Sequence, residues 1–167
     1  MTVRGTLTLL GLFAVLATYL LLVPPPPAPH PSPGTPLLSV PADRVTSLAI
    51  VWADRRLRAT RVGDGWRSDA GASFPADMIE DLLATLSTLR PTETLADGES
   101  AADYGLAPPG ASLVISEGDT RLLQLDVGGR NPAWTGVYVR RTGGAGVELV
   151  GALLDWELGK LRETASH

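Results

Sequence analysis

The chain has 167 residues, contains no cysteine and carries a formal net charge of −4. All eighteen acidic residues and thirteen of the fourteen basic residues follow residue 42, so this part has a net charge of −5. Such a mildly acidic domain is a poor partner for nucleic acid, which we therefore exclude. Without cysteine, a disulfide and a lipid-modified amino-terminal cysteine are excluded too.

A Leu-rich run of nineteen uncharged residues, 5–23, follows Arg4. As a helix rising about 1.5 Å per residue it would span about 28 Å, close to the hydrocarbon thickness of a bilayer. Because a basic amino end is retained inside, we expect residues 1–4 in the cytoplasm, an uncleaved single-pass anchor in the bacterial inner membrane, and the remaining chain in the periplasm. A cleaved signal peptide is the competing interpretation, although no small-x-small cleavage site follows the run.

Eight prolines fall within residues 24–36. Such a segment favours extended polyproline II at about 3.1 Å per residue, so we interpret residues 24–37 as a linker that holds the next domain away from the membrane. A docking peptide for a proline-recognising domain is the alternative role. Residues 38–162 are then the exported domain, and residues 163–167 are a short tail.

The first half of the domain predicts three strands and a helix. Residues 45–52 and 56–62 alternate apolar and polar side chains, as half-buried strands do, and Trp66 opens a third strand after a Gly-Asp-Gly reversal. Residues 75–89 predict the clearest helix, because apolar residues recur at helical spacing and Pro91 follows as a stop. This apolar stripe comprises Ile79, Leu82, Leu83, Leu86 and Leu89.

The second half predicts a similar order of elements. Residues 101–104 form one helical turn closed by Gly105 in a left-handed cap. Hairpins follow within residues 112–127 and 136–150, and a helix over residues 152–161 closes the domain. Because hairpin, extra strand and helix occur twice, the sequence suggests a degenerate internal duplication. The predicted fold class is α+β: antiparallel hairpins with two main helices, preceded by the transmembrane helix and the Pro-rich linker.

Residues able to carry chemistry are scarce. The only histidines are His30, in the proline tract, and His167, the last residue. Without histidine or cysteine in the domain, the common nucleophile–base triads and zinc ligand sets are absent, so we predict no catalytic, cofactor-binding or metal-binding residues. Asp97, Glu99 and Asp103 include a possible carboxylate pair for hydrolysis, but their Gly-Ser context favours a solvated loop.

Basic residues concentrate on one predicted strand. Arg56 and Arg58 share a face of that strand, which is typical of the solvent side of an edge strand and could meet an acidic partner or an anionic glycan. We select Arg56, Arg58, Trp134 and Tyr138 as the candidate interaction surface; a glycan site there requires the two rings to lie exposed near the arginines. Aromatic residues more often pack in or over a core, which is the interpretation that the sequence favours for Trp66, Trp134 and Trp156.

Several short motifs over residues 38–162 resemble one bacterial family. The most specific is Tyr104-Gly105-Leu106 followed by Pro108-Pro109, and on these residues the chain resembles domain-of-unknown-function family 4340. Ala107 stands where members carry an acidic residue. The other matching elements are Pro41 with Val45–Ile50, Asp64-Gly65-Trp66, the helix carrying Leu82, Leu83 and Leu86, and Val127-Gly128 with Tyr138-Val139-Arg140.

Members of the family look like membrane-tethered proteins outside the cytoplasm, and some are associated with ABC-type transporters of the gliding-motility kind. The resemblance therefore implies the same location for this chain. It transfers no catalytic residue, because none is established for the family. Our first hypothesis is therefore a non-enzymatic, membrane-anchored accessory or interaction protein of the cell envelope, without cofactor, whose partner is an envelope protein such as an ABC-type transporter subunit. A periplasmic glycan- or cell-wall-binding module is the alternative, and a carboxylate-based hydrolase is the third hypothesis.

Overall fold

The computed structural model describes residues 34–69, 73–95, 100–144 and 146–165. The predicted anchor, residues 24–33 of the predicted linker, and Asp97 and Glu99 lie outside these ranges. Within them, neither helix has the length and apolar character needed to cross a membrane. The described residues all belong to one unit of the chain, which begins at Pro33.

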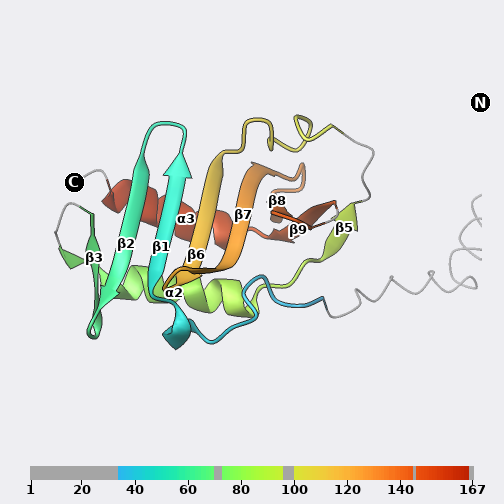
Figure 1. The fold of residues 1–167 in the computed structure, drawn as a ribbon. Helices are drawn as coiled ribbons and strands as arrows, with labels where there is room; N and C mark the ends of the chain where they lie inside the picture. The colour runs from blue at the N-terminus through green and yellow to red at the C-terminus, as the bar shows by residue number, and fades with distance from the viewer. Residues whose placement is uncertain (1–33, 70–72, 96–99, 145, 166–167) are drawn as a thin grey trace, which may run out of the picture. The chain divides into compact units, whose positions relative to one another are not determined.

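A nine-stranded antiparallel sheet in the order β4-β3-β2-β1-β6-β7-β8-β9-β5 forms one layer of this unit (Figure 1). The predicted hairpins are confirmed, and their turns contain glycine at positive φ, for example Gly118 at 55°. The strands are β1 (Ser47–Trp52), β2 (Arg56–Val62), β3 (Gly65–Ser68), β4 (Ser73–Phe74), β5 (Glu93–Leu95), β6 (Ala111–Glu117), β7 (Thr120–Arg130), β8 (Gly136–Arg141) and β9 (Val147–Gly151).

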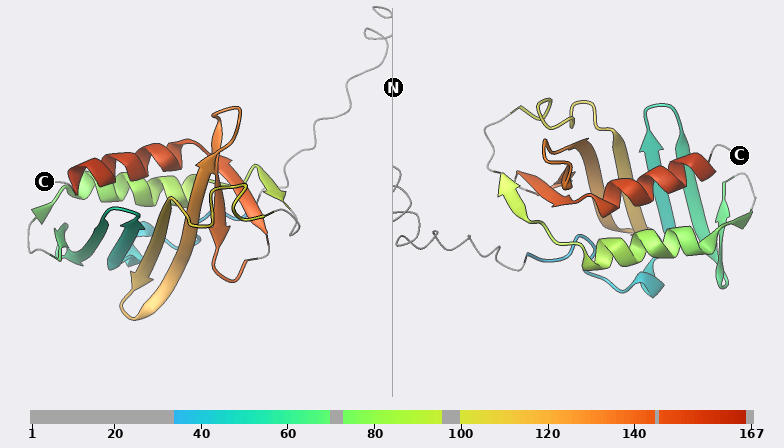
Figure 2. Two further views of the ribbon diagram at one scale, coloured as in Figure 1. Left: turned by 90° about the horizontal axis from the view of Figure 1, so that it is seen from above. Right: turned by 180° about the vertical axis from the view of Figure 1, so that it is seen from behind.

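Two helices, α2 (Ala76–Thr88) and α3 (Leu153–Thr164), form the second layer and cover the same face of the sheet (Figure 2). Both lie within a few residues of the predicted bounds. A short 3-10 helix, η1 (Ala42–Arg44), precedes β1. The predicted α+β class is therefore confirmed for the part of the chain that the structure describes.

The main core lies between the sheet and the helices. Alternate strand residues point toward the helices, and Ile50, Leu113 and Leu125 are each 0% exposed. From α2 the predicted stripe meets them, and Leu83 is also 0% exposed. Burying one such side chain stabilises the fold by about 1.5–3 kcal/mol, so the two-residue alternation and the helical stripe together determine which face of the sheet is covered.

The order of elements repeats along the chain. Strands β1 to β4 are followed by α2, and strands β6 to β9 are followed by α3. The two successions meet where β1 pairs with β6, with Leu48 opposite Ile115 and Ile50 opposite Leu113. Only β5 has no counterpart among the described strands, and it pairs with β9 at one edge. The sheet order is thus nearly symmetric about the β1–β6 pair.

A smaller cluster lies on the opposite side of the sheet, over β8 and β9. Its Tyr104 ring lies 4.7 Å from the ring of Tyr138, centroid to centroid. The predicted left-handed cap is confirmed here: Gly105 has a φ of 68°, and Leu106 N donates a 2.8 Å hydrogen bond to Ala101 O. This 6→1 bond closes the helical turn and directs Leu106 into the cluster, where it is 2% exposed.

Candidate functional site

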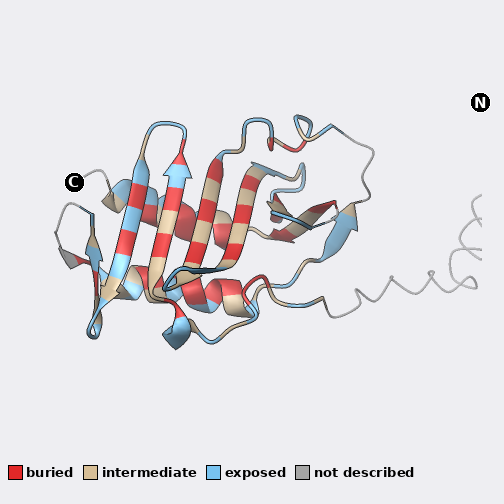
Figure 3. Cartoon of the chain, viewed as in Figure 1, coloured by how far each residue is buried: buried red, intermediate tan, exposed pale blue. Residues whose placement is uncertain are grey.

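The sheet face opposite the helices, over β2, β1, β6 and β7, has no covering helix among the described elements. The pairing register aligns Arg56, Val51, Ser112, Asp126 and Arg140 in one row across five strands. The alternation of buried residues with half-buried or exposed ones is visible along each strand in Figure 3. We call this surface the open face.

The middle of the open face is built from small side chains. Ala49 lies opposite Val114, and both are half-buried, while Val51 is 51% exposed. Ser112, opposite Val51, donates a 2.8 Å hydrogen bond from Oγ to Oδ1 of Asp126. Short side chains of this kind project little from the sheet, so a strand or helix of another protein can approach the surface closely.

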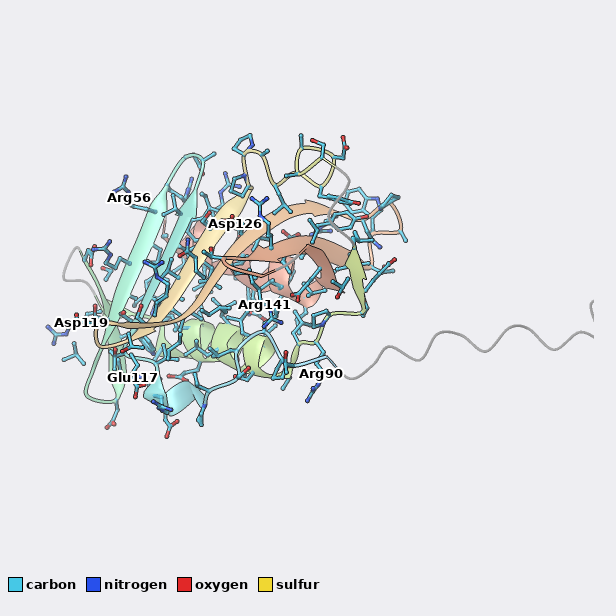
Figure 4. The ribbon with its side chains drawn as sticks, turned by 45° about the vertical axis from the view of Figure 1, so that its right-hand side comes forward. Arg56, Arg90, Glu117, Asp119, Asp126 and Arg141 are labelled. Atoms are coloured by element: carbon cyan, nitrogen blue, oxygen red, sulfur yellow. The ribbon has the colours of Figure 1, made fainter. Side chains whose placement is uncertain are left out.

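Arginines flank this central strip. Arg67 pairs with Thr60, which puts it on the same face as Arg56 and Arg58. Arg58 has a 3.7 Å contact with Asp69, whereas within the described residues Arg56 has no ion-pair partner; Figure 4 shows Arg56 projecting away from β2.

At the opposite side of the strip, Arg140 lies 3.6 Å from Asp126. The four arginines outnumber the two aspartates that they contact, so the open face is net basic although the domain as a whole is acidic.

The structure corrects two expectations about this surface. Strand β2 is not an edge strand, because β1 and β3 pair with it on both sides, so its arginines belong to a sheet face and not to a sheet edge. Nor do the four predicted surface residues form one patch. Tyr138 lies on β8, with Tyr104 against its ring and three strands between β8 and β2, and Trp134 lies in the loop before β8. A glycan site on the Arg strand required both rings to lie near the arginines, and the structure does not bring them together there.

A second surface feature is a pocket of about 380 Å³ between α3 and the adjoining ends of β1, β6 and β7. We call it the α3 pocket. Its lining includes Trp52, Ala111, Val127 and Leu158, which are at most 7% exposed and form an apolar base. A volume of this size is within the usual range for small-molecule sites. Sequence patterns carry no direct signal for it, because its walls come from four separate elements.

One side of the pocket rim is an arginine held between a carboxylate and an aromatic ring. Arg130 Nε donates a 2.6 Å hydrogen bond to Oδ2 of Asp155 on α3, and its guanidinium carbon lies 5.3 Å from the ring centroid of Trp134. The ring is 70% exposed. Trp134 was expected in the core or its cover, and this expectation is wrong because the residue lies exposed in the loop between β7 and β8.

The loop that carries Trp134 is held by one asparagine. Asn131 Oδ1 accepts hydrogen bonds of 2.9 and 3.0 Å from the backbone N–H groups of Thr135 and Gly136. Trp134 has a φ of 60°, a left-handed conformation that costs a residue with a Cβ about 1–2 kcal/mol. Thr135 O in turn accepts a 3.1 Å bond from Ala152 N at the start of α3. An exposed tryptophan is therefore held rigidly at a strained position.

A second exposed tryptophan lies on α3. Trp156 is 58% exposed, which contradicts its expected place in the core, and Lys160 Nζ lies 4.2 Å from its ring centroid. The same ammonium lies 2.7 Å from Oε2 of Glu157 and 3.6 Å from Oδ2 of Asp81 on α2. The hydrogen bond and charge of Glu157, followed by the charge of Asp81, raise the pKa of Lys160. The positive charge of Lys160 is thus balanced by the carboxylates of Glu157 and Asp81.

At the C-terminal end of α3, the β1–β2 turn contacts Arg162, which lines the pocket. Arg162 lies 2.9 Å from Oδ1 of Asp54, and Arg55 donates a 2.9 Å hydrogen bond to the backbone oxygen of Arg162. The hydrogen bond from Arg162, with a smaller one from Arg55, lowers the pKa of Asp54. A cation at a helix C-terminus also compensates the dipole there.

No group of three or more His, Asp or Glu side chains in the described residues could hold a metal ion. Of the three acids considered for hydrolysis, only Asp103 is described, and it lies exposed in the turn before Tyr104. The arrangement offers binding surfaces: a basic sheet face and an apolar pocket with a polar rim.

Taken together, these elements define an α+β domain in which a long antiparallel sheet carries two helices on one face. The sequence model of the family described as "Domain of unknown function (DUF4340)" matches residues 66–165. The chain belongs to this family, as its motifs indicated. No curated protein and no solved structure matches the chain.

Proposed function

We propose that the chain is a non-enzymatic interaction protein of the bacterial cell envelope that holds an acidic protein partner on its open face. The observation that carries the proposal is the coverage of the sheet: both helices lie on one side, so the strip around Ala49 and Val114 has no second layer among the described residues. Arginines at both sides of this strip favour a partner with acidic flanks. Family resemblance makes an ABC-type transporter subunit the leading candidate.

The tether is a separate part of the proposal. Residues 5–23 anchor the chain in the inner membrane, with the amino end in the cytoplasm and the domain in the periplasm. What supports this is the uncharged length of the segment and the single basic residue before it. In spheroplasts, added protease should degrade the domain while the segment stays in the membrane fraction. Protection of the domain from protease would reject this orientation.

Photo-crosslinking in the native bacterium tests the open face. A benzoylphenylalanine introduced at Ala49 or Val114 should capture one acidic protein, whereas the same residue at Ala84, exposed on α2, should not. The double change Arg56→Glu and Arg58→Glu should reduce the captured amount at least tenfold, because it removes the charge complementarity. Arg90→Glu, remote from the open face, is the matched control. Equal capture from Ala84, or capture unaffected by the charge reversal, would reject the proposed surface.

We also infer that the two successions of four strands and a helix descend from one duplicated unit. The near-symmetric sheet order about the β1–β6 pair supports this inference. A profile built from many family members should align its two halves strand on strand and helix on helix. Halves that align no better than shuffled sequences would count against duplication.

A further inference from the structure

We propose that the α3 pocket binds one pyranose ring of a neutral oligosaccharide. This inference goes beyond the proposed protein contact, because the pocket is on the helix side of the sheet and the open face is on the other side. It is independent of the partner's identity and of the tether.

The base of the pocket suits the apolar C–H face of a sugar ring. Ala111, Val127 and Leu158 present only hydrocarbon, and Trp52 adds the surface of an indole. Trp156 stands at the rim with more than half of its surface exposed. Aromatic rings next to an aliphatic floor give a ring-shaped ligand a large contact area at little conformational cost.

The charged groups on the rim select a neutral ligand. Arg130 is paired with Asp155, Arg162 with Asp54, and Lys160 with two carboxylates. An anionic ligand would have to displace the carboxylates of these existing pairs, whereas a neutral ligand leaves them intact.

Hydroxyl groups are the ligand groups that such pairs can serve. A hydroxyl both donates and accepts, so it can donate to the carboxylate of Asp155 while it accepts from the guanidinium of Arg130. Glu163 adds a carboxylate to the lining that has no ion pair among the described contacts. Alternating donors and acceptors around an apolar base match a ring that carries hydroxyls at its edge and hydrogens on its faces.

Gly159 is the position from which the pocket can be filled, because it is exposed on α3 and lines the pocket. It lies in the interior of α3 and lines the pocket, and an added Cβ would meet no atom within 4 Å. Glycine at such a site costs about 1 kcal/mol relative to alanine. Neither backbone conformation nor crowding requires glycine here, since its φ is not positive and the space is open.

Binding is measured on the full chain in a detergent without a sugar head group, such as lauryldimethylamine oxide, by calorimetric titration. The neutral probes are the tetrasaccharides of N-acetylglucosamine, cellulose and starch type, and the charged probe is tetragalacturonate. We expect saturable binding of at least one neutral probe, with a Kd of about 1 mM or lower. Tetragalacturonate should bind at least tenfold more weakly.

Two variants localise the binding. Gly159→Leu fills the pocket with a good helix former and should weaken the neutral probe more than tenfold, while Ala84→Leu, exposed on α2, should change nothing. Trp156→Ala removes the rim platform and should also weaken binding about tenfold. Thermal unfolding of each variant shows whether the fold is intact.

Two results overturn the inference, and a third overturns the selection for neutral ligands. One is the absence of saturable binding of every neutral probe up to about ten times the expected Kd; the other is binding that Gly159→Leu leaves unchanged. Preferential binding of the charged probe likewise overturns the selection for neutral ligands. None of these results bears on the open face, whose own crosslinking test is unaffected by changes at Gly159.

Discussion

The indole nitrogen of Trp66 donates a 3.1 Å hydrogen bond to Oε1 of Glu80 and so joins β3 to α2. Trp66 is 2% exposed, and the same carboxylate oxygen lies 2.9 Å from the guanidinium of Arg61. Arg61 in turn lies 4.9 Å from the Trp66 ring centroid. One glutamate on the helix thus holds two neighbouring strands, β2 and β3, beneath α2.

Glu80→Ala should destabilise the protein by about 1–3 kcal/mol, because it leaves the buried indole N–H without its acceptor. Glu80→Gln keeps a carbonyl oxygen in the same place and should lose less than half as much. Urea unfolding of the three proteins measures the difference. If both variants are equally destabilised, the ion pair with Arg61, and not the indole hydrogen bond, is the main contribution.

Leu83→Ala should destabilise the protein by about 2–5 kcal/mol, because Leu83 is fully buried between α2 and the sheet and its removal leaves a cavity. Leu153→Ala is the matched control: the same deletion at a residue 51% exposed should change stability by less than about 0.5 kcal/mol. Equal losses at the two positions would contradict the assigned faces of the helices.

Local sequence patterns were enough to predict the helices and strands, but not which strands pair with one another in the sheet. The leucine stripe of α2 and the glycine turns of the hairpins determine structure over a few residues, so their bounds could be predicted. The pairing of β1 with β6 joins residues more than sixty positions apart at its widest, and that of β5 with β9 more than fifty. No periodicity within a strand specifies its partner, and the assignment of β2 to an edge failed for this reason.

The two exposed tryptophans show a similar limit. Aromatic residues are usually placed in a core by their hydrophobicity, which is correct for Trp66 and wrong for Trp156. A signal was present, because Trp156 lies between Leu154 and Leu158 and so off the buried stripe of α3. The α3 pocket was beyond prediction, since strand ends and a helix from different parts of the chain form it.

Asp54 gives a pH-dependent contribution to stability. Its folded pKa is lowered, chiefly by the hydrogen bond from Arg162, so the contribution is complete above the unfolded value of about 3.9 and is lost as the pH falls through the folded pKa. The stability difference between the native protein and Asp54→Asn should be constant from pH 7 to about pH 5 and shrink below about pH 4. Urea unfolding at a series of pH values measures it; a difference that grows on acidification would contradict the ion pair.

Gly159→Ala should stabilise the protein by about 0.5–1 kcal/mol, because alanine has the higher helix propensity and its Cβ meets no neighbour. Gly128→Ala is the contrasting change: its Cβ would clash with the backbone oxygen of Tyr104, so it should destabilise. Thermal unfolding of both variants checks the pair. Destabilisation by Gly159→Ala would show that the space beside the helix is not open.

Trp134→Gly should change stability by less than about 1 kcal/mol, although it removes an entire indole side chain. Glycine adopts the left-handed conformation of this position freely, which gains about 1–2 kcal/mol, while the lost contact with Arg130 costs about 0.5–1 kcal/mol and the greater freedom of unfolded glycine costs a similar amount. Trp66→Ala, at a buried ring, should cost about 3–5 kcal/mol in the same unfolding assay. A loss of that size at Trp134 would mean that the ring supports the fold. A small change in stability would mean that the fold does not need the exposed indole at this strained position, which favours a role for the ring in contacting a molecule outside the chain.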